Sequence, residues 1–158
     1  MGFDKWKVPA VGLLCLGLGA AGVYAKGAKQ EYVMVPAGTA KWMPIDAKQP
    51  KGGQFAIIAG DPAAGPVTVM LKLPKGPAPI HWHSSDYSAV VVEGTTKHWL
   101  PGKEADAKAL GVGTAWFQPG GSAATAHGDE CTSDSCTIFI VMPGKFDMTP
   151  LPTPPAKK

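Results

Sequence analysis

The sequence contains no arginine, and all 15 of its basic side chains are lysines. Arginine supplies the planar fork that binds phosphates and carboxylates through paired hydrogen bonds, and it is the residue that most often reads guanine in DNA. A glycine-rich loop leading into a helix, which would cradle the phosphates of a nucleotide, is also missing. The formal net charge is only +3. The sequence therefore predicts no nucleic-acid partner and disfavours nucleotide substrates.

Cysteine is scarce, with three residues in the chain. Cys15 falls in an N-terminal stretch in which Lys5 and Lys7 precede an apolar run over residues 11–23, followed by a cleavage site after Ala25. This pattern is typical of a secretory signal peptide, here the first 25 residues. An uncleaved membrane anchor is the weaker alternative, because the apolar run is short for a bilayer span. We therefore expect a periplasmic or secreted protein that has no membrane contact after signal cleavage.

The other two cysteines would then enter an oxidising compartment, where a disulfide is the default state. Cys131 and Cys136 are close in sequence, so their disulfide would fix the short loop of residues 132–135. Because the loop is short, the bond would mainly set local geometry near His127. The alternative is a separate metal site formed by His127 and both cysteines.

Short runs of β-branched and aromatic residues alternate with turns rich in glycine and proline, which predicts an all-β fold of antiparallel strands, as in a sandwich or barrel. Only residues 103–110 have a helical composition. The last ten residues, 149–158, include four prolines and are expected to be disordered. The domain is thus expected over residues 31–148. The expected strands are residues 31–35, 54–59, 67–73, 88–93, 95–100, 114–118 and 137–142.

His81-Trp82-His83 is the most informative motif, because it holds two of the four histidines in the chain. Alternate side chains of an extended segment share a face, so both imidazoles would point the same way and Trp82 the other. Neutral imidazole is the commonest protein ligand of metals. Two imidazoles on one face, with a third from elsewhere, would bind a divalent ion. The alternative is a pair of surface or hydrogen-bonded core histidines.

The motif lies within a longer pattern: Leu71-Lys-Leu-Pro-Lys-Gly76, then His81-Trp-His83, then Gly94, and later Gly113-Thr-Ala-Trp-Phe-Gln-Pro-Gly-Gly121. This pattern resembles the two signatures of the cupin superfamily. The resemblance implies a jelly-roll β-barrel with a divalent metal inside, whose identity among Zn, Mn, Fe, Ni and Cu stays open. It also implies that the metal ligands are His81, His83 and His127.

The sequence departs from the cupin signatures at two places. Tyr87 occupies the position of the usual metal-binding glutamate, with Asp86 beside it, and His127 comes six residues after Gly121. Asp86, Tyr87 or water could therefore complete the metal's ligands, and Glu93 could join Asp86 or Tyr87 in proton transfer. His98 has no role in either signature and is expected at the surface or lining a pocket.

These observations predict an exported single-domain cupin that binds one metal ion and either acts on or binds a small molecule in the barrel. Metal-centred dioxygenation, isomerisation or hydrolysis would suit a site with free coordination positions. The alternative is a non-enzymatic module that binds or senses a small molecule or a metal. The resemblance also implies that a homodimer could form through edge strands.

Overall fold

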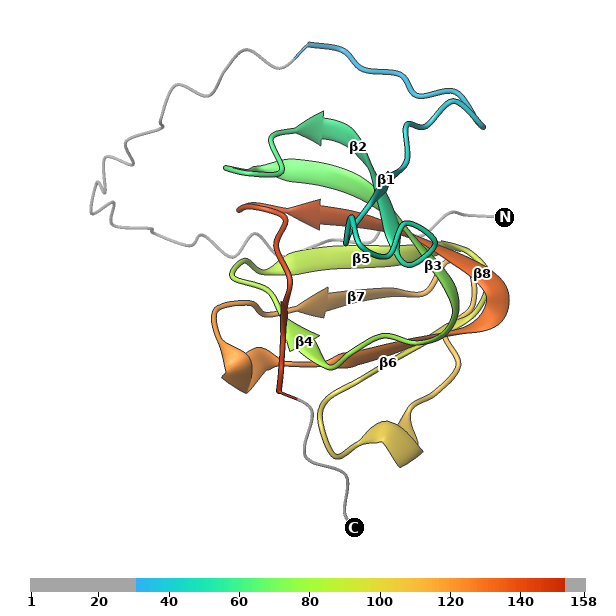
Figure 1. Ribbon diagram of the computed structural model, residues 1–158, viewed down its shortest axis with the longest axis vertical. Helices are drawn as coiled ribbons and strands as arrows, with labels where there is room; N and C mark the ends of the chain where they lie inside the picture. The colour runs from blue at the N-terminus through green and yellow to red at the C-terminus, as the bar shows by residue number, and fades with distance from the viewer. Residues whose placement is uncertain (1–30, 153–158) are drawn as a thin grey trace, which may run out of the picture. The chain divides into compact units, whose positions relative to one another are not determined.

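The computed structural model of the chain describes residues 31–152 (Figure 1). The expected signal peptide, residues 1–25 with Cys15, lies outside the described residues, as does the end of the expected tail, residues 153–158. Within residues 31–152, no helix is long and apolar enough to cross a membrane.

The described residues form antiparallel strands joined by turns, together with two short 3₁₀ turns, η1 (Glu104–Asp106) and η2 (Ala123–Thr125). The expected all-β, antiparallel fold is therefore confirmed. The strands are β1 (Met43–Pro44), β2 (Gln54–Gly60), β3 (Val67–Pro77), β4 (His81–Trp82), β5 (Tyr87–Glu93), β6 (Thr96–Trp99), β7 (Ala115–Gln118), β8 (Gly128–Met142) and β9 (Thr149–Pro150).

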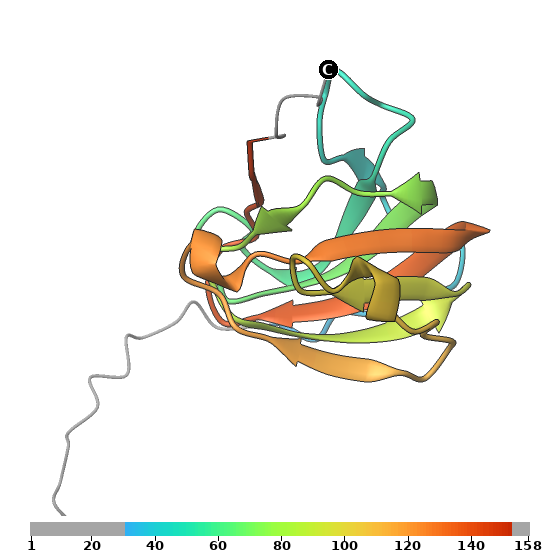
Figure 2. The ribbon, with the colours of Figure 1, turned by 90° about the horizontal axis from the view of Figure 1, so that it is seen from below.

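Strand β8 organises the main sheet, whose order is β1-β2-β3-β8-β5-β7, with β6 also paired to β8. The first part of β8 pairs with β6, its last part pairs with β5, and β3 runs beside both parts. The small sheet contains β4 and β9. Figures 1 and 2 show β8 bending between its two parts, so that the sheet curls around an interior.

The apolar core lies along β3, β5 and the last part of β8, where alternate side chains point inward. Val69, Ala89, Ile138 and Met142 are buried there, whereas Val141, which points outward, is 45% exposed. Burying one such aliphatic side chain contributes about 1.5–3 kcal/mol to folding. The core therefore stabilises one end of the interior mainly through apolar side chains.

A disulfide between Cys131 and Cys136 spans the bend of β8, and both cysteines are buried. The predicted bond is confirmed. Since each sulfur is bonded to the other, the alternative site that joins both cysteines to His127 is wrong. The disulfide instead ties the first part of β8, which follows His127, to the part that carries the core.

The structure differs from the expected strand pattern in several places. Residues 31–35 form no strand, because no neighbouring strand pairs with them, and Tyr32 is exposed. The segment 103–110 forms the turn η1 and, at Leu110, an isolated β-bridge to Thr96, but no longer helix. The expected disordered tail begins with Thr149 and Pro150, which form β9 against Trp82 and His81. Both β3 and β8 are longer than expected, since they pair with each other beyond the core.

Candidate metal centre

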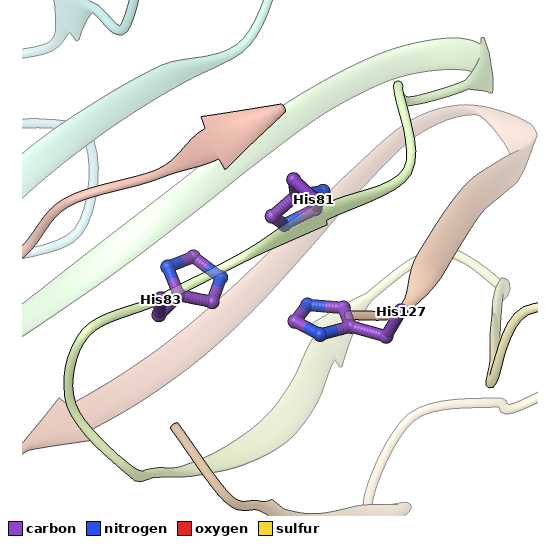
Figure 3. Close-up of side chains that lie close together, drawn as sticks. All are labelled: His81, His83 and His127. Atoms are coloured by element: carbon purple, nitrogen blue, oxygen red, sulfur yellow. The ribbon is translucent and has the colours of Figure 1, made fainter. Parts of the chain in front are cut away.

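The backbone brings the three predicted histidine ligands together. The His81 N–H donates to the His127 carbonyl at 3.0 Å, and the His127 N–H donates to the His81 carbonyl at 2.8 Å. His83 follows β4 on the same face as His81, as alternation requires. One ring nitrogen from each of the three histidines lies within 4.8 Å of the others. Figure 3 shows the three imidazoles around a common space.

Backbone carbonyls fix which nitrogen of each imidazole is free. The Nδ1 of His81 lies 2.7 Å from the Pro79 carbonyl, and the Nδ1 of His83 contacts the Asp147 carbonyl. The Nδ1 of His127 lies 3.5 Å from the Thr125 carbonyl. A carbonyl only accepts hydrogen bonds, so each Nδ1 carries the proton and each Nε2 keeps its lone pair. Metal-binding histidines are oriented by this kind of contact.

The electrostatics favour neutral imidazoles. Burial lowers the pKa of His83, despite the hydrogen bond to the Asp147 carbonyl. Burial also lowers the pKa of His127 to about 3, because it outweighs the attraction of Asp129 and is helped by repulsion from His81 and His98. Neutral imidazole is the form that binds a metal. His83 and His127 are therefore ready for a metal at neutral pH.

Two hollows meet at the histidines. A cavity of about 30 Å³ is lined by His81, His83 and Tyr87 together with Asp129, and it has room for an ion or a water molecule. A cleft of about 370 Å³ also reaches His81 and Asp129. Its walls come from the β1–β2 loop, the end of β3 and residues 148–150. The donor set and the small cavity fit a divalent metal, and the cleft adjoins it.

Asp86, Tyr87 and Glu93 were the candidates for a further metal ligand or a proton-transfer group. Of these, only Tyr87 contacts the histidine cluster. Its hydroxyl lies 3.2 Å from His127 Nε2, and burial raises its pKa, so it stays protonated. The Asp86 carboxylate instead accepts a hydrogen bond from the Gly120 N–H at 2.8 Å, at the exposed surface. Glu93 accepts a hydrogen bond from the Thr137 hydroxyl. Asp86 and Glu93 thus lie outside the cluster.

Asp129, which no sequence pattern indicated, is 8% exposed and lies among the histidines. Its Oδ2 is 3.7 Å from His127 Nε2 and 3.8 Å from His81 Nε2. Although burial opposes ionisation, the hydrogen bond and charge of His98 lower the pKa of Asp129. The same alternation that pairs His81 with His83 places Asp129 beside His127, but the expected strand began only at residue 137.

His98 is half-buried behind Asp129. Its Nδ1 lies 2.7 Å from Asp129 Oδ1, and its Nε2 lies 3.0 Å from Gln118 Oε1. Burial alone would lower the pKa of His98, but the hydrogen bond and the charge of Asp129, aided by Gln118, raise it. His98 thus contacts the site through its hydrogen bond to Asp129. The role of Gln118 was not predicted, because it depends on contacts between distant strands.

Comparison with known proteins supports this fold. The family model described as "Domain of unknown function (DUF4437)" matches residues 26–149. Among curated proteins, none matches the sequence.

Several solved structures are similar to the chain. KdgF from a Halomonas species is 24% identical over 72% of this chain and 94% of its own, with a TM-score of 0.53. An RmlC-like cupin from Shewanella frigidimarina is 20% identical over 73% and 95%, with a TM-score of 0.54. The polyketide cyclase RemF from Streptomyces resistomycificus is 22% identical over 76% and 83%, with a TM-score of 0.58. The predicted cupin fold is therefore confirmed.

Proposed function

This chain belongs to the family described as domain of unknown function DUF4437, and we propose that it is an exported cupin that binds one divalent metal ion through His81, His83 and His127. The proposal extends to a small molecule, which binds in the cleft beside the metal. We assign the cupin domain to residues 31–148, and β9 adds Thr149 and Pro150 at its end.

The observation that carries the proposal is the convergence of three imidazoles, one ring nitrogen from each lying within 4.8 Å of the others. Their Nδ1 atoms face backbone carbonyls, so their Nε2 atoms keep the lone pairs, of which the one on His127 accepts a hydrogen bond from the Tyr87 hydroxyl at 3.2 Å. Among residues 31–152, the Nε2 atoms of His81 and His83 take part in no hydrogen bond, so both lone pairs are available to an ion. Imidazole suits Zn, Mn, Fe, Ni and Cu, so the donor set alone selects no single metal.

The cleft supports a small, mostly apolar ligand. Ile45, Leu71 and Leu73 line it, whereas its polar walls include Asp46 and Lys75. A ligand with one polar end would reach His81 from this cleft. When bound there, the metal would polarise a ligand oxygen or activate a water molecule. The polyketide cyclase among the similar structures acts, by its name, on small molecules, which supports this ligand class.

A non-enzymatic module that binds or senses a small molecule is the second candidate. It is favoured by Tyr87, because a protonated hydroxyl stands where cupin signatures have a carboxylate. The module is supported if a ligand shifts the melting temperature of the metal-loaded chain while neither the ligand nor oxygen is consumed. Turnover of any ligand that also stabilises the chain would support the enzyme.

Export is proposed on the signal-like residues 1–25 and on the disulfide between Cys131 and Cys136, which suits an oxidising compartment. The intact mass of the protein recovered from the periplasm or the medium tests it. We expect a chain that begins after Ala25 and is two hydrogens lighter than its reduced form. A full-length chain with free thiols in the cytoplasm would contradict export.

Elemental analysis of the purified chain tests the metal. We expect about one equivalent in the wild type and in the control Ser88→Ala, which changes an exposed residue of β5, and almost none in His81→Ala/His83→Ala. Equal metal content in all three proteins would defeat the proposal.

A further inference from the structure

Asp129 lies where a further metal ligand would be expected. It is two residues after His127, so both side chains point to the same interior. Donor atoms bound to one tetrahedral zinc ion at about 2.1 Å lie roughly 3.4 Å apart. The Oδ2 of Asp129 lies 3.7 Å from His127 Nε2 and 3.8 Å from His81 Nε2. A small contraction of the side chains would therefore bring all three atoms around one ion.

The placement of Asp129 opposite His98 depends on Gly128, the residue between His127 and Asp129. Gly128 pairs with Trp99 of β6, and a Cβ at Gly128 would lie 2.5 Å from the Trp99 ring. A larger residue would push the first part of β8 away from β6. The glycine therefore keeps Asp129 directly opposite His98, its partner in the strand register.

His98 fixes the orientation of the Asp129 carboxylate. Gln118 donates from Nε2 to the Thr125 carbonyl at 2.8 Å and to the Pro119 carbonyl at 3.2 Å, so its Oε1 faces His98. An amide oxygen only accepts, and His98 must donate to it from Nε2. His98 also donates from Nδ1 to Asp129 Oδ1. With both nitrogens donating, His98 has no lone pair for a metal, although its ring lies near His127.

The other oxygen of Asp129 lacks a partner. Among residues 31–152, no hydrogen bond to Oδ2 is formed, and this atom faces the histidines and the cleft. Because it accepts no hydrogen bond, this oxygen is available to bind a cation in the space that it shares with the histidines. The Tyr87 hydroxyl, by contrast, already has a partner, because it lies 3.2 Å from His127 Nε2. Asp129 Oδ2 is thus the best available acidic donor, since the Asp86 and Glu93 carboxylates lie outside the cluster.

We propose that Asp129 is the fourth protein ligand of the metal centre, through Oδ2, and that His98 and Gln118 are positioning residues that hold its carboxylate in place. The acidic ligand thus comes from β8 instead of the usual position, which Tyr87 occupies at the start of β5. The inference rests on the proposed function, since it requires a metal at the three histidines. A carboxylate ligand also lowers the net charge of the bound centre.

Zinc titration of the full chain against a chromophoric chelator tests this assignment. We expect Asp129→Asn to bind zinc about 100-fold more weakly than the wild type, or weaker still, and His98→Gln to bind about 10-fold more weakly, as outer-shell partners usually do. The matched control is Asp134→Asn, which changes a fully exposed aspartate of the same strand. It should keep the wild-type affinity.

The visible spectrum of the cobalt-loaded chain separates positioning from mere stability. His98→Gln should change the cobalt bands, because a shifted Asp129 alters the ligand field, whereas loss of stability alone would not. If Asp129→Asn does not fold, Asp129→Glu replaces it, with Asp134→Glu as its control. The longer side chain keeps the charge but moves the oxygen, so both affinity and spectrum should change.

The outcomes are distinct. Either of two results overturns the assignment of Asp129 and leaves the three-histidine proposal standing. In the first, the wild type binds zinc, and Asp129→Asn and Asp134→Asn bind it with equal affinity. In the second, the two glutamate variants have equal zinc affinities and equal cobalt spectra. Weaker binding with an unchanged cobalt spectrum in His98→Gln overturns the positioning role. A wild-type chain that takes up no zinc overturns both proposals.

Discussion

The two parts of β8 line the same interior, but the last part contributes apolar side chains and the first part contributes to a polar site. The last part places Ile138, Ile140 and Met142 in an apolar core, whereas the first part places Asp129 among the histidines. Both parts follow the same alternation, with inward side chains two residues apart. The disulfide between Cys131 and Cys136 lies at the bend that separates them.

The difference shows how one strand supplies both stability and a site. Apolar side chains gain free energy simply by leaving water. Buried polar groups lose free energy unless each finds a partner. Asp129 and His98 satisfy each other, but Asp129 Oδ2 and the histidine lone pairs point to one shared space. The polar part is therefore organised for a ligand, and the apolar part holds it in place.

The largest expected effect on stability comes from the apolar part. Met142→Ala should lower the free energy of unfolding by about 2–5 kcal/mol, because it leaves a cavity at a fully buried position. Zinc bound per folded chain should not change. The control Val141→Ala, at the exposed neighbouring position, should cost less than about 0.5 kcal/mol. If urea denaturation showed equal losses of unfolding free energy in Met142→Ala and Val141→Ala, the inward position of Met142 and the outward position of Val141 would be contradicted.

A smaller effect is expected beside the polar part, from Gly120→Ala. A Cβ at Gly120 would overlap the carbonyl group of Ser85, in the turn that follows His83. We expect a loss of about 1–3 kcal/mol from the forced backbone shift, together with weaker zinc binding. Gly111→Ala is the matched control, because a Cβ there meets no atom within 4 Å. A Gly120→Ala protein as stable as the control would show that this turn does not fix His83.

Removing the disulfide that joins the two parts of β8 should lower the free energy of unfolding less than Met142→Ala does. Cys131→Ser/Cys136→Ser should lower the free energy of unfolding by roughly 2 kcal/mol, since the closed loop is short. Reducing the wild type should have the same effect in the same urea titration. If the serine variant were as stable as the oxidised wild type, the disulfide would not stabilise the bend.

The smallest effect is expected at Tyr87. Tyr87→Phe removes one hydrogen bond to His127, which should cost about 1 kcal/mol in the metal-free chain. Zinc affinity should not fall, because the protonated hydroxyl is not expected to be a ligand. A tenfold or greater loss of zinc affinity in the chelator titration would instead identify Tyr87 as a ligand.

The fold was largely predictable from local patterns, and so was part of the site. Strand alternation placed His81 and His83 on one face, and the two signature-like segments indicated the cupin fold and His127. These features depend on residues close in sequence. The family resemblance implied that His127 joins the metal site, but the bridge between His81 and His127 that brings them together was not predicted.

The remainder of the site depends on strand register, which no local pattern records. His98 meets Asp129 because β6 pairs with the first part of β8 in one register. That part was not expected to be a strand, since Gly128 and the polar residues 132–135 interrupt its apolar pattern. Asp86 was one of three alternatives for the remaining ligand, with Tyr87 and water, yet its carboxylate accepts a hydrogen bond from the Gly120 N–H at the exposed surface.

Anomalous X-ray scattering from crystals of the full chain grown with zinc tests the central claim most directly. We expect one strong peak in the space between the Nε2 atoms of His81, His83 and His127, at roughly 2.0–2.2 Å from each. Asp129 Oδ2 should complete the ligands. Zinc found only at surface residues, with ordered histidines and no peak among them, would contradict the account.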